Sequence, residues 1–499
     1  MTERKEKKIR ENSKLLSVIG WAVLGIELVM SVLLIVLAIR MELLPALYTA
    51  VACVGLAALL VIMWLLIRKN TKRVRYFIGT VISLILSIVM VIGSLAVNNV
   101  TSTLQTITDS TEETTRMGVY VRADDSAEDI EDAKFYTFGI MESIIRDDSD
   151  NTIAQIEEEL DLILDVAEFE GISDLADALL DEECDAMIIS EDFVDILTEV
   201  EGYEDFDDEV KEIASYEWTE SVTLREEEDD SDAELEDEDG IFTMYISGID
   251  TYGAVSTKSR SDVNIIAVVN TNTKQVLLIS TPRDYYVELS ISNGVKDKLT
   301  HAGIYGVSVS VDTLEMLYDT EIDYYFRINF TGFEELIDAL GGITVYSEYS
   351  FTVEPDFVYV EGYNELSGIE ALAFARERYS FSSGDRQRGK NQMAVIEGVI
   401  NKLQTTAILK NFSSILDGLE GSFETDMPYS ELAALVKQQL NEGGDWDVVS
   451  YSVDGTGAYS TTYSINQSLY VMVPDESTVA EAKELINSVL ANEVVSSDE

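Results

Sequence analysis

The chain has 499 residues and carries 34 Lys and Arg against 93 Asp and Glu, a formal charge of −59, with one histidine and two cysteines. This composition excludes zinc ribbons, HExxH metal sites and disulfide frameworks, and His301 is the only histidine for a Ser-His-Asp triad. Nucleic-acid binding is disfavoured because it needs a basic surface. The net charge is +7 over residues 1–100, −44 over 101–239 and −22 over 240–499, which predicts different parts joined in series.

Residues 1–100 are predicted to be a cytoplasmic tail followed by three transmembrane helices. The apolar stretches 15–38, 43–67 and 76–97 each exceed the roughly 20 residues that a helix needs to cross the hydrocarbon core. Eleven Lys and Arg precede the first stretch or separate the second from the third, whereas only Arg40 lies between the first two. By the positive-inside rule, everything after about residue 98 is expected outside the cell membrane. A signal peptide is disfavoured because no small-residue cleavage site is present.

Residues 101–225 are predicted to form an acidic extracellular accessory domain. Strand patterns at 117–122 and 186–190 alternate with helical patterns at 152–167, 173–180 and 191–200, which is typical of a small α/β module. No catalytic constellation is present in this part of the sequence. Residues 226–239 are almost wholly acidic and are predicted to be a linker.

Residues 240–499 are predicted to form one layered domain, a central β-sheet flanked by helices, so the chain as a whole is mixed α/β (α+β). The strand patterns are at 242–249, 263–270, 275–281, 324–329 and 446–453. The helical patterns are at 331–340, 368–374, 390–403, 429–440 and 477–490.

The arginines of this last domain are concentrated. Four of its seven fall within thirteen residues, and two more lie beside predicted strand ends; they are Arg376, Arg378, Arg386, Arg388, Arg260 and Arg283. Guanidinium groups suit bidentate phosphate recognition. In an extended segment Arg376 and Arg378 would point to one side, and on a helix Arg388 and Gln392 would share a face. Asp385, at the start of that helix, could cap it or face a substrate. The alternative is a web of surface ion pairs.

Two carboxylates accompany these arginines. Asp250 ends one predicted strand and Asp262 begins the next, so antiparallel pairing would bring them together. Paired carboxylates with an arginine cluster are typical of a divalent ion, Mg²⁺ above all, that bridges a di- or polyphosphate. No GxxxxGK[ST] loop is present, so a nucleotide-binding fold has no support.

The motifs themselves resemble a known family. In chain order they are GID (248–250), RSD (260–262), STPRD (280–284), KLTHAG (298–303), FARER (374–378) and GDRQRGKNQ (384–392). Over residues 240–402, with a similar ending at 470–486, the chain resembles the LytR-CpsA-Psr (LCP) family. Three membrane spans and an accessory domain resemble its capsule-associated, CpsA-type subgroup.

The resemblance implies a membrane-anchored phosphotransferase on the outer face of Gram-positive bacteria. Such an enzyme takes a capsular polysaccharide, teichoic acid or another cell-wall polymer from a polyprenyl pyrophosphate carrier and joins it to peptidoglycan through a phosphodiester. Its cofactor would be Mg²⁺ or Mn²⁺. The alternatives are a non-catalytic lipid-binding sensor of cell-wall biosynthesis, which would have capsule-export proteins as partners, and a polyprenyl-pyrophosphate pyrophosphatase.

The resemblance also implies roles for individual residues. The metal ligands would be Asp250 and Asp262, and the pyrophosphate would be bound by Arg260, Arg283, Lys298, Arg376, Arg378, Arg388 and Gln392. The catalytic residues would be Asp385 and Arg388, with Asp385 as a candidate general base and a metal-held aspartate as its rival. His301 is expected to be structural, at a helix start. The helices after Gly303 and Gly332 would line a tunnel for the isoprenoid tail or form plain core.

Overall fold

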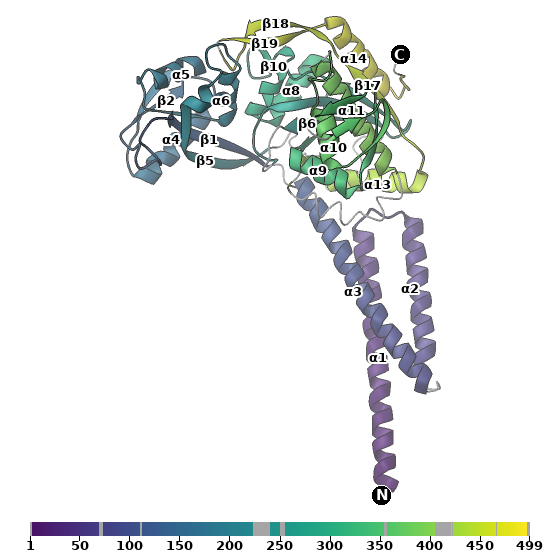
Figure 1. Ribbon diagram of the computed structural model, residues 1–499. Helices are drawn as coiled ribbons and strands as arrows, with labels where there is room; N and C mark the ends of the chain where they lie inside the picture. Colours follow the sequence, from purple (N-terminus) through teal and green to yellow (C-terminus); the bar gives the residue numbers. More distant parts are fainter. Residues whose placement is uncertain are drawn as a thin grey trace. The chain divides into compact units, whose positions relative to one another are not determined.

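The computed structural model describes residues 2–68, 73–109, 112–222, 240–249, 255–353, 357–382, 384–404, 421, 423–465 and 467–496. The predicted linker 226–239 and the candidate metal ligand Asp250 lie outside these residues. The chain divides into two compact units (Figure 1). One contains residues 1–109 and 427–444, and the other contains the accessory and C-terminal sheets.

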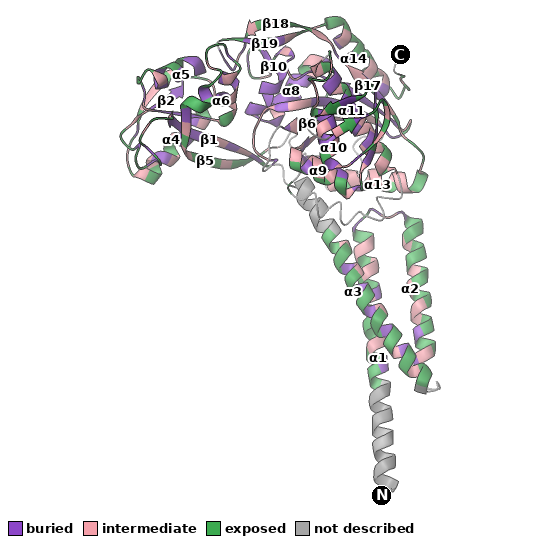
Figure 2. Ribbon diagram, viewed as in Figure 1, coloured by how far each residue is buried: buried purple, intermediate pink, exposed green. Residues whose placement is uncertain are grey.

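The first unit contains three long N-terminal helices. They are α1 (Thr2–Arg40), α2 (Ala46–Ile67) and α3 (Arg73–Asp109). Their segments Val18–Arg40, Ala46–Ile67 and Val74–Asn99 are long and apolar enough to cross a membrane, as the sequence predicted. Most of their side chains are not covered by protein (Figure 2), as expected of helices that face lipid. Helix α13 (Tyr429–Glu442) belongs to the same unit, with Ala433 packed against Met41 and Leu43.

The accessory domain is a five-stranded sheet in the order β3-β2-β4-β1-β5 within the described residues. The strands are β1 (Glu112–Arg122), β2 (Thr137–Met141), β3 (Asp165–Phe169), β4 (Ala186–Ile189) and β5 (Val210–Ser221). The helices are α4 (Arg146–Leu160), α5 (Ile172–Leu180), α6 (Glu191–Thr198) and α7 (Phe206–Glu209). Met187 and Ile189 of β4 pack with α5 and α6, whereas Ile188 between them packs with α4. The two faces of the sheet are thus covered by different helices.

One predicted helix of this domain is wrong in its second half. The helical pattern at 152–167 is realised only as far as Leu160, the last residue of α4. Asp161 follows with a left-handed φ of 51°, which ends the helix. Residues 165–169 instead form β3, which pairs in parallel with β2. The sequence pattern predicted neither of these two strands. The pairing partner, which is distant in sequence, decides the conformation here.

The C-terminal domain has a mixed six-stranded sheet in the order β16-β11-β6-β7-β8-β17 within the described residues. The strands are β6 (Ile241–Ile249), β7 (Ser261–Asn270), β8 (Gln275–Ser280), β11 (Tyr324–Ile328), β16 (Phe423–Thr425) and β17 (Asp447–Ser452). Pairs β6–β11 and β8–β17 are parallel, and the others are antiparallel. Five of these strands coincide with the five strand patterns of the sequence, and the mixed α/β class is confirmed.

Helices cover both faces of this sheet. Ile266 and Val268 of β7 pack in one apolar cluster with α8 (Val307–Tyr318) and α14 (Glu476–Leu490). Ile265 and Ala267 point the other way and pack with Met393 of α11 (Asp385–Leu403). Because successive side chains alternate across a strand, the middle of a strand buried on both faces is apolar, as residues 265–269 of β7 are.

Smaller elements complete the domain. Among the described helices of this domain, three have side-chain caps at their starts: α9 (Phe330–Ala339), through Asn329, α10 (Gly368–Arg376), through a Ser367–Glu370 capping box, and α14, through Asp475. The short strand pairs are β9 (Tyr286–Glu288) with β10 (Lys296–Lys298), β12 (Ile343–Ser347) with β15 (Gly362–Leu366), β13 (Phe351–Val353) with β14 (Phe357–Tyr359), and β18 (Gly455–Thr461) with β19 (Ser468–Pro474). A 3₁₀ helix, η1 (Leu299–Tyr305), precedes α8.

The accessory and C-terminal domains share buried contacts within their unit. Helices α5 and α6 lie in one apolar cluster with Ile304, Ile465 and Leu469 of the C-terminal domain. A buried polar connection lies beside β11, where Arg327 donates to Glu113 of β1 and to Glu424 of β16, both at 2.8 Å. Glu113 also accepts from the backbone N–H of Val307 at the start of α8. Both apolar and charged groups therefore hold the two domains together.

Candidate active site

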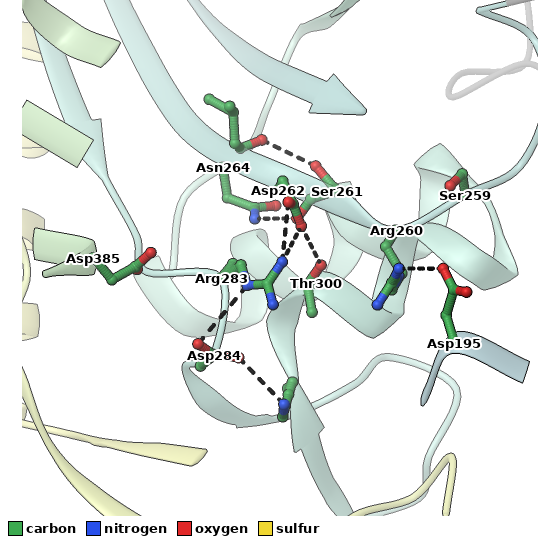
Figure 3. A network of polar contacts seen from close by, with 12 residues as sticks. Asp195, Ser259, Arg260, Ser261, Asp262, Asn264, Arg283, Asp284, Thr300 and Asp385 are labelled. Atoms are coloured by element: carbon green, nitrogen blue, oxygen red, sulfur yellow. Dashed lines mark hydrogen bonds and ion pairs between the residues drawn. The ribbon is translucent and has the colours of Figure 1, made fainter. Parts of the chain in front are cut away.

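A β-bulge presents Asp262 at the start of β7. Gly248 of β6 lies opposite Val263, and Ile249 lies opposite Ser261, so Asp262 is the extra residue without a partner. Such a bulge redirects the side chain of the extra residue. The carboxylate of Asp262 accepts from Nη1 of Arg283 at 2.8 and 3.0 Å, and from Oγ1 of Thr300 at 3.3 Å (Figure 3).

Buried hydrogen bonds hold the strands behind Asp262. The hydroxyl of Tyr245 donates to Oδ1 of Asn264 at 2.7 Å and lies 2.9 Å from the hydroxyl of Ser261. Nδ2 of Asn264 in turn donates to the carbonyl of Ser261 at 2.9 Å. Because each of these polar groups is satisfied inside the protein, the bulge has a defined conformation.

Gly303 allows η1 to pack closely against the same turn. A Cβ at this position would lie 2.4 Å from the carbonyl oxygen of Ser259 and 3.0 Å from the backbone nitrogen of Ser261. These are backbone atoms, which cannot turn aside as a flexible side chain can. The glycine of the KLTHAG motif therefore places Thr300 within reach of Asp262.

His301 of the same motif is completely buried. Its Nδ1 lies 2.6 Å from Oδ1 of Asp297, and Oδ2 of Asp297 accepts from the backbone N–H of Ser464 at 2.7 Å. Burial alone would raise the pKa of Asp297, but His301 and Ser464 outweigh it and lower that pKa below its ordinary value. This environment agrees with the structural role expected for His301.

Arg283 is the central cation of the site. It follows β8 by three residues, and besides Asp262 it approaches Asp284, with Nε 3.8 Å from Oδ2. Lys298 lies 3.3 Å from the other oxygen of Asp284. Burial alone would raise the pKa of Asp262, but Arg283, Arg388 and Arg260 outweigh it and lower that pKa below its ordinary value.

The first turns of α11 form the opposite wall. Asp385 begins the helix and forms an ion pair with Arg388, and Gln392 follows one turn later. A pocket is lined by these three residues together with Asp262, Arg283, Ser280, Thr281 and Arg386. Burial raises the pKa of Asp385, and the attraction of Arg388 offsets only part of that effect. The helix places Arg388 and Gln392 on one face, as their spacing predicted.

Three predicted phosphate-binding arginines do not line this pocket. Arg260 is directed toward the accessory domain, where Nη2 lies 2.6 Å from Oδ2 of Asp195 (Figure 3). Arg376 stacks on the ring of Phe330, with Cζ 4.1 Å from its centroid. Arg378 donates to the hydroxyl of Tyr379 at 2.7 Å. The expectation that Arg376 lies in an extended segment is wrong, because it is the last residue of α10.

The structure also shows neighbours that the sequence analysis did not assign. Asp284 pairs with Arg283 and Lys298, and Thr300 contacts Asp262. Both residues stand inside sequence motifs, STPRD and KLTHAG, so their position was a usable signal. Arg386 pairs with Asp454, which precedes β18. No sequence pattern identified the contact of Arg260 with Asp195, because 65 residues separate the two.

The carboxylates available for a metal ion are few in the described part of the chain. No group of three or more His, Cys, Asp or Glu side chains able to hold a metal is found among those residues. Asp262 supplies two carboxylate oxygens, and in the sequence Asp250 follows Ile249, the last residue of β6. One or two carboxylates, with the remaining positions filled by water and substrate phosphates, suit Mg²⁺. Asp262 thus fits a metal site that substrate completes.

Comparisons with known proteins give consistent matches. A family model described as the LytR_cpsA_psr family matches residues 199–486. The polyisoprenyl-teichoic acid–peptidoglycan teichoic acid transferase TagU of Bacillus licheniformis is 32% identical over 263 residues, which cover 52% of this chain and 82% of that protein. The protein of the same name from Enterococcus faecalis is 33% identical over 219 residues, 43% of this chain and 71% of that protein. The crystal structure of B. subtilis TagV is 25% identical and covers 52% of this chain and all of that one, with a TM-score of 0.43.

Proposed function

Because the chain belongs to the LytR-CpsA-Psr family, we propose that it is a membrane-anchored phosphotransferase that moves a capsular or other cell-wall glycopolymer from a polyprenyl pyrophosphate carrier to peptidoglycan. The observation that carries the proposal is the pocket in which Arg283 and Arg388 meet Asp262 and Asp385. Two guanidinium groups beside two carboxylates suit a substrate that is itself a dianionic phosphate ester.

In the proposed reaction, a hydroxyl of peptidoglycan attacks the phosphorus that bears the glycopolymer. A new P–O bond to peptidoglycan forms, and the bond to the bridging oxygen of the pyrophosphate breaks. Polyprenyl phosphate leaves with the electron pair of that bond. Arg283 and Arg388 stabilise the negative charge that develops on the phosphoryl oxygens and the leaving group. No covalent intermediate with the protein is needed, so the reaction requires no catalytic cysteine or Ser-His pair.

Asp385 is proposed as the group that accepts the proton of the attacking hydroxyl. It lies in the pocket, and its raised pKa makes it a stronger base than an ordinary aspartate. Arg388, its partner at the next turn of α11, orients the carboxylate. Asp262 and Asp250 are proposed to hold a Mg²⁺ or Mn²⁺ ion, which would neutralise charge on the pyrophosphate. Gln392, on the same face of α11 as Arg388, is proposed to hydrogen-bond a phosphate oxygen.

The membrane helices fit this substrate. A polyprenyl carrier is confined to the bilayer, so an enzyme anchored there meets it at a high effective concentration. The distribution of Lys and Arg around the three spans supports a cytoplasmic N-terminus and an extracellular C-terminal domain. Peptidoglycan, the proposed acceptor, lies on that outer side.

The test uses the full chain in liposomes with a polyprenyl-pyrophosphate oligosaccharide, MgCl₂ and soluble peptidoglycan fragments. Mass spectrometry follows both polyprenyl phosphate and the sugar–peptidoglycan adduct. We expect metal-dependent adduct formation that Arg388→Ala abolishes and Lys390→Ala retains. Lys390 is the matched control because it is exposed on the same helix and pairs with Glu348. Polyprenyl phosphate without adduct would indicate a pyrophosphatase, and lipid binding without either product would indicate a sensor.

A further inference from the structure

Helix α6 of the accessory domain carries carboxylates toward the candidate site. Asp192 and Asp195 lie on α6, and Glu199 immediately follows its last residue. Their spacings of three and four residues place them on one face of the helix. That face meets Arg260, Arg283 and Lys298, three of the cations predicted to bind the pyrophosphate.

Arg260 is held by α6 at several points. Besides the contact with Asp195 at 2.6 Å, its Nη1 lies 3.5 Å from Oε1 of Glu199. Oδ1 of Asp192 accepts from the hydroxyl of Ser259 at 3.2 Å and from the backbone N–H of Arg260 at 3.3 Å. Figure 3 shows Arg260 directed to Asp195, while Arg283 is directed to Asp262. The nearest carboxylate of Arg260 is thus Asp195 and that of Arg283 is Asp262, while Glu199 lies near both arginines.

Glu199 connects this contact to the centre of the site. Its Oε2 accepts from Nζ of Lys298 at 2.5 Å, and its Oε1 lies 3.8 Å from Nη2 of Arg283. Burial alone would raise the pKa of Glu199, but Lys298, His301 and Arg283 outweigh it and keep that pKa below its ordinary value. Glu199 is thus a carboxylate anion in contact with the cations that a phosphate would need.

Buried apolar side chains hold helix α6 in place, whereas its carboxylates are partly exposed. Phe193 and Ile196 of α6 are fully buried, and the ring of Phe193 packs edge-on against Tyr305 at 6.5 Å between centroids. The side chain of Asp195 is 46% exposed and that of Glu199 is 27% exposed. An ion pair whose carboxylate is as exposed as that of Asp195 is weak, whereas Glu199 pairs with Lys298, which is only 3% exposed. A phosphate dianion forms stronger charge-assisted hydrogen bonds with guanidinium groups than these carboxylates do. It can therefore displace the carboxylates, and only their side chains need to rotate.

We propose that Asp195 and Glu199 act as an internal competitor of the substrate and thereby set the affinity of the site for pyrophosphate. This inference rests on the proposed function, since it concerns the same cations. When a pyrophosphate binds, Asp195 and Glu199 turn toward solvent and release Arg260, Lys298 and one side of Arg283. When the phosphate groups leave the site, Asp195 and Glu199 return to these cations.

The experiment measures binding of inorganic pyrophosphate to the full chain in detergent, with Mg²⁺, by titration calorimetry. The variants are Asp195→Asn and Glu199→Gln, alone and together, which keep shape and remove charge. Glu201→Gln is the matched control, because Glu201 is exposed two residues further along the chain. We expect the double variant to have about a tenfold lower Kd, which corresponds to a binding free energy more favourable by about 1.4 kcal/mol. The Kd of Glu201→Gln should be unchanged.

An unchanged or higher Kd in the double variant would overturn the inference, because residues that merely position the cations would weaken binding when neutralised. The unfolding midpoint of each variant is measured alongside, and Asp195→Asn alone, at a half-exposed position, covers the case in which Glu199→Gln misfolds. Arg388→Ala separates the two proposals. If wild type binds pyrophosphate and Arg388→Ala does not, the proposed site stands whatever the α6 variants do. If neither wild type nor any α6 variant binds it, both proposals fail.

Discussion

Arg327 and Glu113 form a buried ion pair at 2.8 Å, although one stands on a strand of the C-terminal sheet and the other on a strand of the accessory sheet. Each side chain is only 3% exposed. Glu424 is the second partner of Arg327, also at 2.8 Å. One guanidinium group thus compensates two buried carboxylates, and the accessory domain supplies one of them.

We expect Arg327→Ala to destabilise the protein by about 3–5 kcal/mol, because it leaves Glu113 and Glu424 buried without a cation. The urea-unfolding midpoint of the full chain in detergent measures the effect. Arg146→Ala is the control, because Arg146 forms ion pairs at the surface of α4. This substitution should lower the free energy of unfolding by no more than about 1 kcal/mol. Equal midpoints for the two variants would contradict this account of the interface.

The pKa of Asp385 leads to a pH dependence. As a general base Asp385 must be ionised, and burial keeps its proton bound to a pH above the ordinary aspartate value of 3.8. The rate of transfer should therefore rise with pH through an apparent pKa above 3.8. Asp385→Asn should lower the rate of transfer by about 10²-fold or more. The fall of the rate at acidic pH should also disappear from its pH profile.

Asp445→Asn is the control for this measurement, because Asp445 is exposed and outside the pocket. Its profile should coincide with that of wild type. If Asp385→Asn keeps the fall of the rate at acidic pH, another group, such as a metal-held aspartate, is the base.

Metal removal tests the role of Asp262. EDTA should stop transfer, and Mg²⁺ or Mn²⁺ should restore it. Asp262→Asn should raise the concentration of Mn²⁺ needed for half-maximal binding by about tenfold or more, since an amide replaces a charged ligand. Titration calorimetry with Mn²⁺ in the presence of pyrophosphate measures this directly, with Asp312→Asn, at an exposed position of α8, as control. Identical affinities would place the metal elsewhere.

Gly303→Ala should disturb the turn that carries Arg260 and Asp262. Its Cβ would lie 2.4 Å from a backbone oxygen, so either η1 or the turn must move. We expect a lower unfolding temperature together with slower transfer. Gly55→Ala on α2 is the control, because in the described part of the chain nothing lies within 4 Å of its Cβ position. If Gly303→Ala has wild-type stability and rate, the close packing of η1 is not required.

The sequence predicted well what depends on local periodicity. Strands such as β7 are long apolar runs between polar turns, and α14 has a regular amphipathic pattern, so both were found near their observed bounds. The helical pattern of α11 was recognised only from residue 390, because its first turns are polar and face the pocket, but the helix begins at Asp385, where the sequence placed its start. Polar site residues interrupt the apolar pattern from which a helix is recognised.

Long-range contacts account for the remaining differences. Residues 165–169 became a strand because β2 pairs with them, and Arg260 is directed to Asp195 because α6 lies beside it. Arg376 stacks on Phe330, 46 positions earlier in the chain. The sequence identifies which residue types the site contains, but the partner of each charged side chain depends on the tertiary fold.

The pairing of β1 with β5 bears on how this protein could have arisen. Glu112, at the start of β1, lies opposite Ser221, at the end of β5, so the accessory module begins and ends side by side. A module with adjacent ends can be inserted into a chain, or removed from it, without displacing the segments on either side. Residues 112–221 therefore have the architecture of an inserted cassette. Gaining or losing this module would add or remove Glu199, a carboxylate that contacts Lys298 and Arg283 of the C-terminal domain.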